Sequence, residues 1–212
     1  MSILSTLLFP PCCVGCEKFG TVLCLDCYEQ LEFIPIPITL KLSPLYLDQV
    51  ITACNYQEPL TTIIQHLKYQ SVKKVAEILG QLLYDAVSFP TCDVITAVPL
   101  HPKKYGLRGF SQSEEIAKKV SALTAVPYYP LLIKTKHTKA QAEIKDREQR
   151  LHHLEQCFAI HPQLPTSFPT LHPSVLLIDD VVTTGSTLNA CAQVLKARGF
   201  QKVVGLTVGH GQ

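Results

Sequence analysis

The sequence predicts an α/β fold in which a mostly parallel sheet is flanked by helices, with a small cysteine-rich module in front of it. Three observations support this prediction. Short apolar segments alternate with segments of helical periodicity after residue 48, and one strongly apolar run leads through a glycine-containing turn into a helix. Five cysteines fall within residues 12–27. With 212 residues and 47% hydrophobic content, the chain can bury one full core and a small appendage.

The expected elements follow from apolar patterning. Strands are predicted where short apolar runs are bounded by turn residues, at 49–56, 93–98, 128–133, 175–178 and 203–208. Apolar residues at helical spacing predict two helical pieces within 58–87 and further helices at 114–123 and 186–198. Ser111 and Glu114 have the spacing of a capping box, and Gly199 is a helix stop signal.

A proline-punctuated stretch divides the chain. Residues 34–38 alternate isoleucine and proline, which disfavours a helix and suits an extended linker or an edge strand. We therefore expect a module over 1–35 and a larger domain over 36–212.

Composition limits the possible settings. A net charge of +2 does not by itself indicate a nucleic-acid binder, although local basic patches are compatible with it. The apolar start lacks basic residues and is too short for a membrane span, so none is expected. Nine cysteines, an odd number gathered mainly at one end, suit a reducing compartment with a local metal site. We therefore expect a cytoplasmic protein.

Two CxxC pairs predict a structural zinc site. They are Cys13 with Cys16 and Cys24 with Cys27. Each CxxC presents two thiolates to one tetrahedral ion, and four protein ligands leave no open position for water. Cys12 is an alternative to Cys13, which is favoured because it makes the two pairs symmetric.

The segment 175–187 predicts a phosphate-binding loop. An apolar strand leads to Asp179 and Asp180, and a turn then opens a helix. Amides at a helix N-terminus bind phosphate, helped by the helix dipole, and Gly185 permits close backbone approach. The hydroxyl groups in this turn add uncharged donors; they belong to Thr183, Thr184, Ser186 and Thr187.

The two acids refine the predicted ligand. Carboxylates repel phosphate at contact distance, but they suit the hydroxyls of an adjoining sugar and the water shell of a magnesium ion held mainly by that sugar and a second phosphate group. The pair formed by Asp179 and Asp180 therefore favours a sugar phosphate over a free anion. No GxxxxGK[ST] sequence is present, which disfavours a P-loop nucleotide site.

This stretch resembles the phosphoribosyl-diphosphate binding motif of type I phosphoribosyltransferases. The resemblance implies a type I phosphoribosyltransferase-like domain. It also implies that Asp179 and Asp180 hold the ribose hydroxyls, that residues 183–187 hold the 5-phosphate, and that Mg²⁺ accompanies the ligand. In that family the loop after the first core strand binds pyrophosphate, which corresponds here to residues 99–104 with Lys103 and Lys104.

Three features together resemble the ComF family, also known from GntX-type proteins. They are the double CxxC, the segment 98–112 with Arg108-Gly-Phe-Ser-Gln112 in place of the usual RGFNQ, and a basic hood over 136–158 that contains Gln141, Arg147 and Arg150. Arg108 is a further candidate ligand because it lies inside this signature. The chain departs from the family pattern at Ser111 and at His153, where the family usually has asparagine.

The ComF resemblance implies a role in natural competence, in which single-stranded DNA enters the cell. We therefore expect a protein that binds phosphoribosyl diphosphate and acts in DNA uptake. The alternative is an active phosphoribosyltransferase that passes ribose 5-phosphate to an acceptor and releases pyrophosphate; the sequence does not decide whether the protein is an enzyme. The basic residues of 134–156 can lie along single-stranded DNA, or the zinc module can dock a helicase or another DNA-processing protein.

Overall fold

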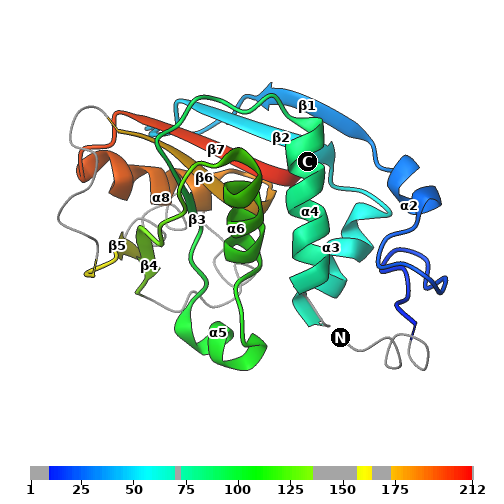
Figure 1. Ribbon diagram of the computed structural model, residues 1–212. Helices are drawn as coiled ribbons and strands as arrows, with labels where there is room; N and C mark the ends of the chain where they lie inside the picture. The colour runs from blue at the N-terminus through cyan, green and yellow to red at the C-terminus, as the bar shows by residue number, and fades with distance from the viewer. Residues whose placement is uncertain (1–9, 70–72, 136–156, 164–172, 212) are drawn as a thin grey trace, which may run out of the picture.

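A five-stranded, mostly parallel sheet organises the protein (Figure 1). The computed structural model describes residues 10–69, 73–135, 157–163 and 173–211. The strands lie in the order β1-β2-β7-β6-β3, and only the edge strand β1 is antiparallel to its neighbour. Their bounds are β1 Phe33–Ile38, β2 Gln49–Asn55, β3 Val94–Ala97, β6 Ser174–Val182 and β7 Lys202–His210.

Helices cover both faces of this sheet, because alternate residues of each buried strand point to opposite sides. Leu176 and Ile178 of β6 pack into one core, under the helices α3 (Leu60–Tyr69), α4 (Lys73–Ala86) and α6 (Gln112–Thr124). Val175 and Leu177 pack into the other core, under α8 (Ser186–Ala197) and a two-stranded ribbon of β4 (Leu132–Lys134) and β5 (Phe158–Ile160). The predicted α/β class with a mostly parallel sheet is confirmed.

Most of the predicted elements are present. The strands predicted at 49–56, 93–98 and 203–208 are β2, β3 and β7, and the helical pieces within 58–87 are α3 and α4. The strand predicted at 128–133 is shorter: Tyr128 forms an isolated bridge with Ile95, and β4 begins only at Leu132.

Two local predictions need correction. Ser111 is the N-cap residue of α6, but its side chain makes no capping hydrogen bond, and Glu114 pairs with Lys118 instead. The capping box is therefore wrong. The expected pyrophosphate loop at 99–104 is also interrupted, because the short helix α5 (Pro102–Arg108) begins at its fourth residue. Pro102 favours this start, since its fixed φ suits the first turn of a helix.

The cysteine-rich segment packs against the body of the protein. It contains the short helix α2 (Leu25–Glu29), and Val14, Leu23 and Tyr28 pack against the core beneath α3 and α4. The strand β1 passes through the boundary expected at residue 35, so one sheet strand spans both predicted units. Within the described ranges, no helix combines the length and the apolar character needed to cross a membrane.

Candidate functional site

The candidate site lies at the carboxyl ends of the parallel strands β3 and β6, where β6 extends beyond the end of β3. The last pair of the two strands is Ala97 with Ile178; β3 ends there, two residues before Pro99, while β6 continues to Val182. The sequence predicted that Asp179 and Asp180 follow the strand; instead both acids lie within it. Neighbouring residues of a strand point to opposite faces, so the two carboxylates occupy different environments.

Asp179 is held by two hydrogen bonds to the same oxygen. The Ser113 hydroxyl donates to Asp179 Oδ1 at 2.8 Å, and the Asp180 amide donates to that oxygen at 2.9 Å. Burial raises the pKa of Asp179 to about 8, the negative charge of Asp180 adds to the rise, and these hydrogen bonds oppose it. The second oxygen of Asp179 has no hydrogen-bond partner among the described residues, which leaves it for a ligand.

Asp180 is half-buried and keeps its contacts local. The Val181 amide donates to Asp180 Oδ1 at 2.8 Å, and no described cation forms an ion pair with this carboxylate. Together the two acids offer two half-buried carboxyl groups on successive residues. This arrangement suits neighbouring hydroxyl groups of a sugar.

The loop after β6 presents unused amides to a hollow. The hollow is lined by Asp179 and by residues 181–188. Within the described part of the chain, no acceptor is bound by the amides of Thr183, Thr184, Gly185 and Thr187. The loop opens α8, whose dipole places partial positive charge at the same point. An anion of phosphate size fits this donor set by its chemistry.

Gly185 meets two requirements of the loop. Its φ of +77° lies in the left-handed region that glycine adopts most readily. A Cβ placed on it would lie 2.4 Å from Leu40 Cδ1 and 2.8 Å from Leu40 Cδ2, so no larger residue fits unless Leu40 moves. The side chain of Leu40 therefore forms one wall beside the loop.

The segment that carries Leu40 is fixed to α8 by hydrogen bonds to side chains of that helix. Asn189 Oδ1 accepts from the Tyr46 amide at 2.7 Å, and Asn189 Nδ2 donates to the Pro44 carbonyl at 3.0 Å. The Gln193 amide also donates to the Tyr46 hydroxyl at 3.3 Å. These contacts couple the connection between β1 and β2 to the helix that follows the loop.

The predicted basic residues lie on α5, at the same edge of the sheet. Lys103 and Lys104 are exposed, and Arg108 in the last turn is half-buried. Because β3 and β6 are parallel neighbours, α5 follows β3 at the edge where the phosphate loop follows β6. Whether these three side chains contact a ligand stays a prediction.

Lys134 is a site residue that the sequence did not identify in this role. Its ammonium lies 5.1 Å from the centre of the Phe158 ring, and it forms no ion pair with a described carboxylate. Burial lowers the pKa of Lys134, and the positive charge of Lys104 acts in the same direction, while the negative charge of Asp179 opposes both. Lys134 on β4 therefore lies close enough to Lys104 of α5 and to Asp179 for their charges to affect its pKa.

The four predicted cysteine ligands come together. The Sγ atoms of Cys13, Cys16, Cys24 and Cys27 all lie within 4.8 Å of one another, with Cys16 and Cys24 3.6 Å apart. Tetrahedral zinc with sulfur at about 2.3 Å requires sulfur atoms about 3.8 Å apart. This cluster could hold a metal ion such as zinc. Cys12 is outside it and donates toward the Pro10 carbonyl at 3.9 Å.

Local backbone features support metal binding at this cluster. Burial opposes ionisation of Cys13, but hydrogen bonds from the amides of Cys24, Gly15 and Cys16 lower its pKa to about 6. Amides that donate to a sulfur stabilise the thiolate that a metal requires. A Cβ on Gly15 would lie 2.8 Å from Cys27 Sγ, so glycine lets the two CxxC segments approach closely.

Ser113, Lys134, Leu40 and Asn189 are the site residues that sequence reasoning missed. Ser113 directly follows the signature ending at Gln112, but nothing in the chain indicates that it reaches a strand 66 residues later. The hood residues Gln141, Arg147 and Arg150, and the basic segment after residue 135, lie outside the described residues.

Comparison of the chain with known proteins found relatives named as competence proteins and as DNA utilization proteins. It is 29% identical over 203 residues to competence protein F of Haemophilus influenzae, covering 90% of this chain and 86% of that protein. It is 26% identical over 162 residues to the DNA utilization protein YhgH of Escherichia coli K12, covering 73% and 69%. With competence protein ComFC of Streptococcus pneumoniae it shares 33% identity over 106 residues, covering 50% and 43%. No family model matches the chain.

Comparison with solved structures found matches of low similarity. The allosteric regulatory enzyme of purine biosynthesis superposes with a TM-score of 0.42 and 19% identity. The phosphoribosylpyrophosphate amidotransferase of B. subtilis gives a TM-score of 0.40 and 20% identity. Each match covers 62% of this chain and 25% of the other. The resemblance to the ComF family that the sequence predicted is confirmed by the relatives named above.

Proposed function

We propose that this chain, a relative of the ComF competence proteins, binds phosphoribosyl diphosphate and acts in the uptake or use of DNA. One observation carries the ligand assignment: the unused amides of the 183–187 loop share a hollow with the Asp179 carboxyl group, at the N-terminus of α8. An anion site beside sugar-hydroxyl acceptors selects a sugar phosphate over a free anion.

The proposed contacts divide the ligand into three parts. The 5-phosphate accepts from the loop amides and from the hydroxyls of residues 183–187. The ribose hydroxyls bind Asp180 and the oxygen of Asp179 that Ser113 leaves open. The diphosphate extends toward the basic side chains of α5, namely Lys103, Lys104 and Arg108.

The residues present also fit the predicted Mg²⁺. Magnesium prefers oxygen ligands and keeps several waters, which Asp180 can bind from its half-buried position. Bound with the ligand, the ion would neutralise part of the charge on the diphosphate. The protein's own residues hold the phosphate and orient the sugar.

For residues 1–35 we propose a structural zinc module. Four thiol ligands close the coordination shell, so the ion stabilises the fold and has no position for a reacting water. The division into 1–35 and 36–212 is part of this proposal, with β1 joining the two units in one sheet. Phe19 is 74% exposed and Leu25 68% exposed, which gives this module an apolar surface for a helicase or another DNA-processing protein.

Calorimetric titration with phosphoribosyl diphosphate and Mg²⁺ tests the ligand assignment. Wild type should bind, and the double variant Asp179→Asn, Asp180→Asn should bind at least about tenfold more weakly, since charged hydrogen bonds to the ribose are lost. Asp85→Asn, which changes an exposed carboxylate on α4, is the matched control. Absence of binding by folded wild type would refute the assignment.

Transfer of the ribose 5-phosphate is a second candidate function. The position of Lys134 near Lys104 and Asp179 favours it, because converging cations stabilise the negative charge that develops on a departing pyrophosphate. Release of pyrophosphate from phosphoribosyl diphosphate in the presence of candidate acceptors measures it. Loss of that release in Lys134→Met, with ligand binding retained, would support this function.

A further inference from the structure

The residues of helix α5 lie at the surface of the protein. None of its seven residues is buried. Leu107 is 88% exposed and Tyr105 is 46% exposed. Figure 1 shows α5 projecting from the body of the protein, at the far end of α6 from the β1 edge of the sheet. Burial in the core therefore does not explain why this helix forms.

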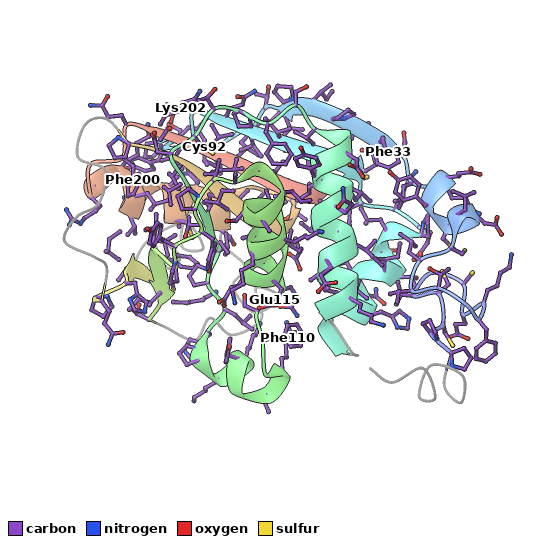
Figure 2. The ribbon with its side chains drawn as sticks, in the orientation of Figure 1. Phe33, Cys92, Phe110, Glu115, Phe200 and Lys202 are labelled. Atoms are coloured by element: carbon purple, nitrogen blue, oxygen red, sulfur yellow. The ribbon has the colours of Figure 1, made fainter. Side chains whose placement is uncertain are left out.

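Two end groups hold α5 in place. The Lys103 amide donates to His101 Nδ1 at 3.2 Å, which caps the first turn. Gly109, with a φ of +76°, ends the helix and donates its amide to the Tyr105 carbonyl at 2.7 Å. Phe110, labelled in Figure 2 between α5 and α6, then packs against the main core. The backbone of α5, which carries the exposed side chains, is therefore held in a fixed position.

The charge around α5 is one-sided. Residues 99–112 contain Lys103, Lys104 and Arg108 and no carboxylate, whereas the whole chain has a net charge of only +2. The nearest acids along the chain, Glu114 and Glu115, form ion pairs with Lys118. Among the described residues these three cations form no ion pair, so the exposed tyrosine and leucine of α5 lie among positive charges.

We infer that α5 is a contact surface for single-stranded DNA. This inference depends on the DNA-related part of the proposed function, and its cations are the ones proposed above to meet the diphosphate, namely Lys103, Lys104 and Arg108. The cations complement the phosphate backbone, and an exposed aromatic ring with a neighbouring apolar side chain complements unpaired bases. In a duplex the faces of the bases are stacked and inaccessible, so duplex DNA would contact only the cations of α5. The helix is about 10 Å long, so it contacts a few nucleotides.

Fluorescence anisotropy with a labelled oligothymidylate, titrated at several salt concentrations, tests the inference. Three phosphate contacts predict a slope of log K against log salt of about −2, since each contact on a single strand contributes about −0.7. Lys103→Gln should reduce the slope to about −1.4. Tyr105→Ala should weaken binding by roughly five- to a hundredfold with little change in slope, because base stacking is lost.

Matched controls come from other surfaces. Tyr84 on α4 is 42% exposed, close to the value of Tyr105, so Tyr84→Ala should leave DNA affinity unchanged. Lys202, labelled in Figure 2 at the opposite end of the molecule from α5, is exposed, and Lys202→Gln should also have no effect.

Several outcomes would overturn the inference. One is the absence of oligothymidylate binding by wild type, which would indicate that α5 contacts a protein partner. The others are an equal affinity for a duplex of the same length and an unchanged DNA affinity in Tyr105→Ala. Titration of Tyr105→Ala with phosphoribosyl diphosphate separates the two proposals. Retained sugar-phosphate binding with weakened DNA binding is the expected result, and loss of both would mean that α5 serves the ligand site instead.

Discussion

The Ser113 hydroxyl on α6 donates to Asp179 Oδ1 on β6 at 2.8 Å, and it joins two segments that lie 66 positions apart in the chain. The amide of Asp180 donates to the same oxygen. Because both bonds use Oδ1, they fix the carboxyl group of Asp179, which lines the hollow of the phosphate loop. Ser113 is therefore a positioning residue for the proposed ribose contact.

Ser113→Ala should weaken binding of phosphoribosyl diphosphate about tenfold. Leaving a partly buried acceptor without its hydrogen bond costs about 1–3 kcal/mol, and part of that cost is the lost orientation of Asp179. Calorimetric titration measures the change, and Ser113→Thr, which keeps the hydroxyl, should restore most of the affinity. The control is Ser121→Ala, on the same helix, whose lost bond to the Val126 carbonyl affects stability only. Equal affinities in wild type and Ser113→Ala would contradict this role.

The stability of the ligand-free protein should depend on pH through Asp179. Burial raises its pKa to about 8 in the folded protein, against about 3.9 in the unfolded chain. Between these values the folded protein keeps a proton that the unfolded chain has lost, so the free energy of unfolding falls as the pH rises. Asp179→Asn cannot ionise and should melt above wild type at about pH 8.5, with a smaller difference near pH 4.

Asp93 provides a comparison of opposite sign. Hydrogen bonds from the Ser174 hydroxyl and amide lower the pKa of Asp93, so its contribution is present at neutral pH and is lost as the pH falls through the folded pKa. Asp93→Asn should therefore melt below wild type at neutral pH. Thermal scans of both variants across pH check the two signs. A fixed melting difference between Asp179→Asn and wild type at every pH would show that Asp179 is not buried with a raised pKa.

Metal binding should distinguish the adjacent cysteines Cys12 and Cys13. Cys13→Ser should lose zinc, because its sulfur lies in the four-cysteine cluster, whereas Cys12→Ser should keep one zinc per chain. Elemental analysis of the purified variants gives the metal content, and thiolate-to-cobalt absorption after substitution reports the ligand set. Chelation of wild type should expose the amides of 10–31 to hydrogen exchange before those of β6. Equal zinc content in the two variants would exclude the assignment of Cys13.

A substitution that adds a side chain at Gly185 should lower stability for two reasons, the contact with Leu40 and the positive φ of the backbone. Gly185 and Gly109 have almost the same positive φ, +77° and +76°, but only Gly185 has Leu40 within contact of a new Cβ. Gly109→Ala should lose about 1–2 kcal/mol of stability from the backbone alone. Gly185→Ala should lose more, and it should also weaken anion binding at the loop.

Chemical denaturation of the single and double variants measures the Leu40 contribution. In the Gly185→Ala background, Leu40→Ala should recover part of the lost stability, which is a coupling that additive effects would not produce. The pair Gly109→Ala with Leu40→Ala should be additive, since nothing lies within 4 Å of a Cβ at Gly109. Coupling of the same size at both glycines would show that Leu40 does not lie over Gly185.

The sequence by itself determined the elements and the local chemistry of this protein. Periodicity located β2, α3, α4, α8 and β7, because apolar spacing along one segment needs no knowledge of its neighbours. The spacing of Cys13, Cys16, Cys24 and Cys27 indicated a metal site for the same reason, since each CxxC pair is a local structure. The loop from Asp179 to Thr187 was visible as one continuous run.

Tertiary structure decided how distant segments meet at the loop. Only the parallel pairing of β3 and β6 brings α6 close enough for Ser113 to reach Asp179, and only the connection from β1 to β2 places Leu40 over Gly185. The pKa of Asp179 was likewise out of reach of the sequence, because it depends on burial by residues from several elements. Contacts between residues far apart in the sequence depend on how the whole chain packs. The residue pattern of one segment predicts only the local structure of that segment.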